Sequence, residues 1–272
     1  MQGRLSEPYK NKIQSFPITT WKKEFKLASN CGFEVIEWIF DELQPNPILT
    51  SEGISDIGML MKKYNIAINS ICADYFMTRK LFNESKFELE KNIKILRELI
   101  MQASKLEISL IEIPLVDSSS LKTSKNKIEI VKNLNEVSSF AEKNNITIVL
   151  ETDLNPHDFK ELLMKFNYPS IMANYDSGNS ASLGYNSKDE LTILKKWIKN
   201  VHVKDRKLHG GTVPLGTGDT NFEQFFLTLS EIDYVGDLII QGARFPDEKI
   251  PPEDTCKTYE KFVKRYVDKY YV

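Results

Sequence analysis

Short apolar runs alternate along the chain with longer amphipathic stretches, and this alternation limits the possible folds more than any other feature of the sequence. The short runs are rich in β-branched residues and are bounded by Gly, Pro, Asn or Asp, as strands are. They cover residues 34–38, 67–72, 108–113, 147–151, 171–176, 200–203 and 237–241. Helices are predicted between them, at residues 20–31, 55–64, 84–105, 123–143, 157–166, 188–199, 221–232 and 253–271. Asn155 followed by Pro156 is a typical helix start.

Strands that alternate with helices must pair in parallel, because each parallel neighbour needs a crossover connection. Eight such units close a barrel, and a chain of 272 residues is an ordinary length for one. We therefore predict an α/β fold, a single (β/α)8 TIM barrel domain over residues 1–272. Residues 1–5 supply only the end of the first strand, which is short or truncated at the N-terminus. An open, doubly wound sheet is the alternative.

Composition excludes several classes of function. The formal net charge is −2 and there is no long basic run, so nucleic acid is not expected as a partner. No apolar run approaches the roughly 18 residues of a membrane span, and MQGRLSEPYK at the start lacks the apolar region of a signal peptide. The three cysteines form no CxxC pair and are expected to be buried free thiols. We expect a cytoplasmic protein without a membrane partner.

Polar side chains stand near the ends of the last four predicted strands. In such barrels catalytic groups lie at the C-terminal strand ends, and neighbouring strands are only ~4.8 Å apart. Singly, each residue is more often a helix cap, a solvated group or a satisfied core histidine. Four on successive strands favour a shared divalent cation, and mixed carboxylate, imidazole and amide oxygens suit Mn²⁺, Mg²⁺, Co²⁺ or Zn²⁺. The predicted ligands of this one metal ion are Glu151, Asp176, His202 and Gln241.

At these residues the chain resembles the xylose isomerase-like barrel superfamily, and most closely its sugar phosphate isomerase/epimerase group, which includes ketose 3-epimerases and inosose dehydratases. The motifs that carry the resemblance are MQGRLS at 1–6, IVLE at 148–151, YDSGN at 175–179, VHVKD at 201–205 and PLGTGDTNF at 214–222. The family binds a divalent metal with two glutamates, an aspartate and a histidine. Three of these match Glu151, Asp176 and His202, whereas the fourth, normally glutamate, is Gln241 here.

The resemblance implies an isomerase or epimerase that transfers a proton beside a metal-polarised carbonyl of a sugar or sugar phosphate, with Glu151 as the base. An amide cannot take up a proton, so Gln241 removes one base of a two-base epimerase but leaves one-base chemistry intact. The alternatives are a metal-dependent dehydratase or lyase acting on a polyol or keto-sugar, and a catalytically degenerate sugar-binding barrel. An abasic-site endonuclease is disfavoured, because its metal cluster is rich in His and this chain has three.

Basic and polar residues near the strand ends are candidates for holding a phosphate, a carboxylate or hydroxyls of the substrate. These substrate-binding candidates are Lys204, Arg206, Arg244, Asn179 and Arg4. Four titratable residues near predicted strand ends could supply a second base, although solvated positions are the simpler interpretation; they are Glu37, Glu112, Asp153 and His157. Similar barrels often form homodimers or homotetramers, and a small carbohydrate is the expected partner.

Overall fold

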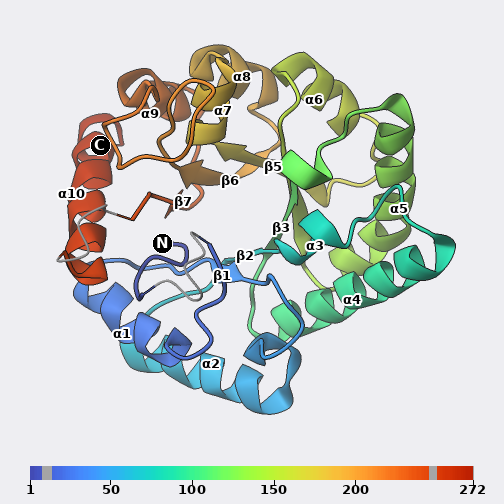
Figure 1. Ribbon diagram of the computed structural model, residues 1–272, viewed down its shortest axis with the longest axis horizontal. Helices are drawn as coiled ribbons and strands as arrows, with labels where there is room; N and C mark the ends of the chain where they lie inside the picture. Colours follow the sequence, from blue (N-terminus) through green and yellow to red (C-terminus); the bar gives the residue numbers. More distant parts are fainter. Residues whose placement is uncertain (8–13, 245–249, 272) are drawn as a thin grey trace.

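The computed structural model describes residues 1–7, 14–244 and 250–271. Seven parallel strands form one sheet in which the strand order follows the sequence, so each strand pairs with the next along the chain. Figure 1 shows the strands at the centre and the helices around them. The strands are β1 (Trp38–Ile39), β2 (Ser70–Cys72), β3 (Leu110–Leu115), β4 (Thr147–Thr152), β5 (Ile171–Asp176), β6 (Ile198–Val203) and β7 (Leu238–Ile240).

The first two residues close the sheet into a barrel. Gln2 forms a parallel bridge with Glu37, and the Glu37 amide donates to the Met1 carbonyl over 3.1 Å. On the other side the Gln2 amide donates to the Ile240 carbonyl, also over 3.1 Å. The N-terminal segment thus lies between β1 and β7, where Figure 1 places the N-terminus. The structure confirms the predicted barrel and excludes the open sheet.

The outer ring consists of helices that bury one face each. In α4, for example, Leu96, Leu99 and Ile100 are buried, whereas Phe87 at its start is exposed. The predicted start of α6 is confirmed, because the Asn155 side chain accepts hydrogen bonds from two backbone amides there. The helices are α1 (Trp21–Asn30), α2 (Ser51–Tyr64), α3 (Tyr75–Thr78), α4 (Lys86–Lys105), α5 (Ser124–Lys143), α6 (Pro156–Leu163), α7 (Ser177–Leu183), α8 (Ser187–Leu194), α9 (Phe222–Glu231) and α10 (Pro252–Tyr270).

Two α-helices were not predicted, and several boundaries were wrong. The helix expected over 55–64 already begins at Ser51, and the strand expected over 34–38 is β1 at Trp38–Ile39. The helix expected over 188–199 ends at Leu194, and β6 already begins at Ile198. The short helix α7 has the sequence SGNSASL, whose small residues give no apolar periodicity. It starts because Asp176 caps it, which is a local hydrogen-bonding effect and not an amphipathic one. The other unpredicted helix, α3, spans four residues.

The strand side chains divide into an apolar outer layer and a polar inner one. Ile111, Leu150 and Val201 are fully buried between strands and helices and belong to the hydrophobic core. The inward side chains are equally buried but polar, and they include Gln2, Glu37, Ser70, Glu112, Asn200 and His202. Burying polar groups this deeply costs folding free energy unless they are hydrogen-bonded. The polar interior of the barrel therefore indicates a binding or catalytic site. The three cysteines are buried and free, as expected. Within the described residues, no helix has both the length and the apolar character to cross a bilayer.

Candidate metal centre

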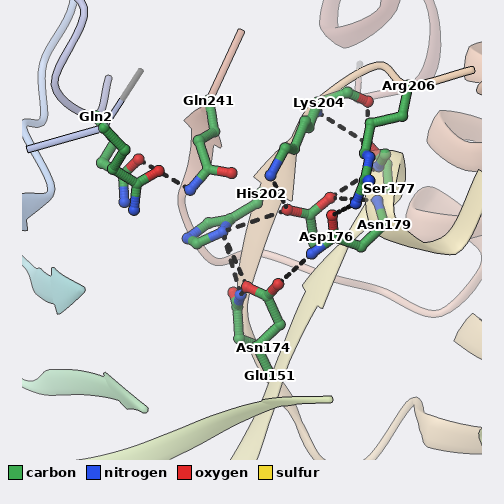
Figure 2. Close-up of polar contacts among 12 residues, drawn as sticks. Gln2, Glu151, Asn174, Asp176, Ser177, Asn179, His202, Lys204, Arg206 and Gln241 are labelled. Carbon is green, nitrogen blue, oxygen red and sulfur yellow. Dashed lines mark hydrogen bonds and ion pairs between the residues drawn. The ribbon is translucent and has the colours of Figure 1, made fainter. Parts of the chain in front are cut away.

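Three of the four predicted ligands meet at the C-terminal ends of β4, β5 and β6. Ligand atoms of Glu151, Asp176 and His202 all lie within 4.8 Å of one another. The His202 Nδ1 atom is 3.5 Å from Glu151 Oε2 and 3.9 Å from Asp176 Oδ2. All three side chains are buried, and Figure 2 shows them turned toward a common point.

The register of the sheet produces this convergence. Asp176 and His202 are direct partners in the β5–β6 pairing. Asp176 Oδ1 accepts hydrogen bonds from the amides of Gly178 and Asn179, both at 2.8 Å, and thereby caps α7. Its Oδ2 atom has no hydrogen-bond partner among the described residues and faces His202 and the Lys204 ammonium, which is 3.4 Å away. One carboxylate therefore both starts a helix and presents a free oxygen to the site.

The charges in the site are strongly coupled. Burial opposes ionisation of Glu151, yet hydrogen bonding to His202 and the charges of His202 and Lys204 lower its pKa to about 2. Burial also disfavours the charged form of His202, but Glu37 and Glu151 raise its pKa well above the usual value. Burial raises the pKa of Asp176 despite the nearby Lys204. The buried carboxylates thus make the site strongly negative and favour a proton on His202, and a divalent cation would have to displace that proton to bind there.

Gln241, the fourth predicted ligand, follows β7 and is 4% exposed. Its Nε2 atom donates to Gln2 Oε1 over 2.9 Å, which fixes the orientation of the amide. Its Oε1 atom has no hydrogen-bond partner among the described residues. In Figure 2 this oxygen is turned toward Lys204 and His202. The amide therefore presents an acceptor, and not a donor, to the site.

These residues fit a divalent cation. Two buried oxygens, Asp176 Oδ2 and Gln241 Oε1, lack hydrogen-bond partners within the described part of the chain, and the Lys204 ammonium 3.4 Å from Asp176 Oδ2 is the cation nearest to the first of them. Such atoms normally cost about 1–3 kcal/mol each unless something satisfies them. A metal ion held by carboxylate, imidazole and amide oxygen would do so, and this donor set suits Mn²⁺, Mg²⁺, Co²⁺ or Zn²⁺.

Three of the five substrate-binding candidates lie beside this site. Asn179, Lys204 and Arg206 line a cavity of about 520 Å³ that Glu151 and Gln241 also line. Asn179 donates to Glu151 Oε1 through Nδ2 and accepts from Arg206 Nη1 through Oδ1. Arg206 also donates twice to the Gly210 carbonyl. This chain of contacts ties the loop after β6 to the Glu151 carboxylate.

The other two candidates lie where the N-terminal segment joins β1 to β7 and closes the barrel. We call this junction the seam. Arg4 is 2% exposed and donates to the Gly242 carbonyl and to Gln2. Arg244 donates to the carbonyls of Ser6 and Gly3. Neither residue lines the 520 Å³ cavity. Their hydrogen bonds to the backbone connect the N-terminal segment to the chain after β7.

The interpretation of Glu37 and Glu112 as solvated residues is wrong, because each is only 1% exposed. Glu112 lines the cavity beside Glu151, and burial together with the Glu151 charge raises its pKa well above the usual value. Glu37 lies on the far side of His202, with its Oε1 atom 2.9 Å from Nε2. Asn174, which shares a strand face with Asp176, donates to Glu151 Oε2 over 2.9 Å. Alternation along the strands was the signal for all three. By contrast, Asp153 and His157 are not buried.

Comparisons with known proteins agree with this fold and identify its family. A family model described as "Xylose isomerase-like TIM barrel" matches residues 25–257. The Haemophilus influenzae protein named "Putative L-ribulose-5-phosphate 3-epimerase SgbU" is 26% identical over 82% of this chain and 83% of its own length. The inosose dehydratase of Clostridium tetani is 25% identical over 67% of this chain and 71% of its own length. The crystal structure of IOLI protein with a bound zinc atom superposes with a TM-score of 0.78 at 19% identity, covering 92% of this chain and 93% of that one.

Proposed function

Because the chain belongs to the xylose isomerase-like TIM barrel family, we propose that it is a divalent-metal-dependent isomerase or epimerase of a sugar or sugar phosphate. The observation that carries the proposal is the convergence of Glu151, Asp176 and His202 within 4.8 Å at the mouth of the barrel. A relative named as a ribulose-phosphate epimerase supports the reaction class. The zinc atom in the IOLI structure supports the metal.

In the proposed site Glu151, Asp176, His202 and Gln241 hold the ion. When bound, the ion polarises the substrate carbonyl and so acidifies the neighbouring C–H group. Lys204 lies in the same cavity, 3.4 Å from Asp176, and places a positive charge where a substrate oxygen gains negative charge. Asn179 and Arg206 line the cavity wall and are suited to bind substrate hydroxyls or a phosphate.

Glu151 is the proposed base. Its pKa of about 2 keeps the carboxylate ionised at neutral pH. Asn174 and Asn179 donate to its two oxygens and hold the carboxylate plane in one orientation. A base so oriented removes a proton from the carbon beside the carbonyl and returns it to the neighbouring carbon, which interconverts an aldose and a ketose. Gln241 cannot serve as a second base, so isomerisation needs Glu151 alone, whereas epimerisation at one carbon needs a further proton donor on the opposite face of the substrate.

Dehydration is a second candidate, favoured by the similarity to inosose dehydratase. It begins with the same proton removal by Glu151 but continues with loss of a hydroxyl group from the next carbon. The two reactions differ in their products, because an epimerase conserves the mass of its substrate whereas a dehydratase loses one water.

The test combines a metal measurement with an exchange experiment. Purified protein is stripped with a chelator and reloaded with Mn²⁺, Mg²⁺, Co²⁺ or Zn²⁺. It is then incubated in D₂O with a panel of ketoses, ketose phosphates and keto-inositols, and the products are analysed by NMR and mass spectrometry. We expect deuterium next to the carbonyl of at least one compound only with metal present, and a loss of roughly 10³-fold or more in Glu151→Gln.

A product lighter than its substrate by one water would assign the dehydratase, with or without deuterium incorporation. If the wild-type protein retains no metal under any of these conditions and neither reaction occurs, the proposal is wrong.

A further inference from the structure

His202 is held from both sides of its ring. Its Nδ1 atom faces Glu151 and Asp176, whereas its Nε2 atom lies 2.9 Å from Glu37 Oε1. The side chains of His202 and Glu37 are both fully buried. Glu37 comes from the chain just before β1, on the far side of the barrel axis from Asp176, and lines no part of the cavity that contains Glu151.

Two donors fix Glu37 itself. Ser70 Oγ donates to Glu37 Oε2 over 2.6 Å, and Asn200 Nδ2 donates to the same atom over 3.0 Å. These donors come from β2 and β6, so hydrogen bonds from two different strands fix the orientation of the Glu37 carboxylate inside the barrel. Its Oε2 atom already accepts two hydrogen bonds, and only Oε1 is left for His202.

When a metal ion is bound, His202 must be neutral, and this arrangement then selects one of its two tautomers. Nε2 must carry the proton to donate to a carboxylate oxygen, and the Nδ1 lone pair then faces Glu151 and Asp176. The amide groups of Asn174 and Asn200 flank the two ring nitrogens, with Nδ2 atoms 3.2 Å from Nδ1 and 3.4 Å from Nε2, so the charged Glu37 carboxylate, at 2.9 Å from Nε2, decides between the tautomers. Metal-binding histidines in general bind better when the other ring nitrogen donates to a carboxylate.

We propose that Glu37 is a positioning residue that holds His202 with its proton on Nε2 and thereby sets the metal affinity of Nδ1. The inference rests on the proposed metal centre and adds a residue that does not touch the metal. A competing use of the same atoms exists, because Glu37, Glu112 and His202 also bring ligand atoms within 4.8 Å of one another. A second cation there would have to displace the bond between Glu37 and His202.

The test uses the variants Glu37→Gln and Glu37→Asp. Whichever way the glutamine amide turns, its NH₂ group faces a donor, either Asn200 Nδ2 or the Nε2–H of His202. Aspartate keeps the charge but has a shorter reach. The control is Glu24→Gln, which alters another buried carboxyl group. Glu24 lies on α1 and accepts a hydrogen bond from Ser6 Oγ.

Mn²⁺ alone is titrated calorimetrically into each metal-free protein. We expect Glu37→Gln to bind 10- to 100-fold more weakly, Glu37→Asp to recover part of the loss, and Glu24→Gln to match the wild type. The proton on His202 is located by ¹⁵N NMR of the Zn²⁺-loaded wild-type protein, in which only three histidines contribute signals. The expected spectrum has the His202 proton on Nε2 and the metal on Nδ1.

Each outcome decides a definite question. Two metal equivalents per wild-type chain, or a zinc-loaded His202 with its proton on Nδ1, would overturn the role of Glu37 even if Glu37→Gln does not fold. Equal Mn²⁺ affinity in Glu37→Gln and wild type would overturn it as well, while leaving the proposed function in place. A wild-type protein that binds no metal would remove both proposals together.

Discussion

At the scale of single residues, Gln241 is the feature that most sets this site apart from a pattern of two glutamates, one aspartate and one histidine. Its Nε2 atom is bound to Gln2, so only its oxygen is available to a metal. Replacing this neutral ligand by a carboxylate adds a negative charge next to the ion. We predict that Gln241→Glu binds Mn²⁺ at least tenfold more tightly, which corresponds to about 1.4 kcal/mol or more. Calorimetric titration measures the change.

The matched variant Gln241→Ala removes the ligand oxygen and should bind Mn²⁺ more weakly than wild type. Identical affinities in all three proteins would show that Gln241 is not a ligand. The catalytic activity of Gln241→Glu gives a second, independent test. A gain of epimerisation in Gln241→Glu would mark the wild type as a degenerate member of its family, whereas loss of a native reaction would mark it as a specialised one.

The residues predicted from the sequence were those at strand ends. Strand alternation and the ~4.8 Å spacing between strands suffice to bring Glu151, Asp176 and His202 together, because these constraints act locally. Glu37 lies one layer deeper, and its contact with His202 spans 165 residues along the chain. Only closure of the barrel creates that contact. Alternation along the strand indicates that the Glu37 side chain points into the barrel, but the sequence does not identify His202 as its partner.

At the scale of elements, the helix pair α7 and α8 depends on one buried carboxyl group. Glu190 on α8 accepts hydrogen bonds from Tyr175 at the end of β5 and from Ser180 on α7. The same helix α7 carries Asn179, which donates to Glu151. Burial raises the pKa of Glu190 from 4.5 to about 7, so the folded protein holds this proton more firmly than the unfolded chain does.

The sign of the pH dependence follows from that difference. The contribution of Glu190 to stability is complete below pH 4.5 and is lost as pH rises to about 7. The loss is on the order of 3 kcal/mol for a shift of this size. Glu190→Gln keeps a neutral acceptor at the same place. We predict that the variant, compared with wild type, becomes relatively more stable between pH 5 and pH 8, as measured by chemical denaturation. Parallel pH profiles of the two proteins would contradict this.

The same pair of helices marks the limit of prediction at this scale. Amphipathic helices such as α4 and α5 were predicted within a few residues, because their apolar faces pack on the sheet. In contrast, the four buried residues of α7 are three serines and one glycine. The helix therefore has no apolar stripe from which it could be predicted. It is held by the Asp176 cap and by Glu190, both of which require tertiary structure.

At the scale of the whole molecule, the barrel is closed by very few backbone contacts. Gln2 forms a bridge with Glu37 on one side, where the Glu37 amide donates to the Met1 carbonyl, and its own amide donates to the Ile240 carbonyl on the other. Arg4 reinforces this seam by donating to the Gly242 carbonyl, to the Gln2 carbonyl and to Gln2 Oε1. Gln2 Oε1 also accepts from Gln241, so the seam and the metal centre share a hydrogen-bonded side chain. Closure of the barrel therefore orients the fourth predicted ligand.

Arg4 was a candidate substrate anchor from the sequence, and its contacts allow the two roles to be separated. If it holds the seam, Arg4→Met leaves buried carbonyls without donors and should cost roughly 3 kcal/mol. For a chain of this size that lowers Tm by roughly 6–12 °C. KM for a substrate found in the exchange experiment should stay nearly unchanged. Arg206→Met is the matched control, because Arg206 lines the cavity; its KM should rise while its Tm falls less than that of Arg4→Met. A raised KM with an unchanged Tm in Arg4→Met would instead place Arg4 at the substrate, since a group that touches only the seam cannot alter substrate binding without altering stability.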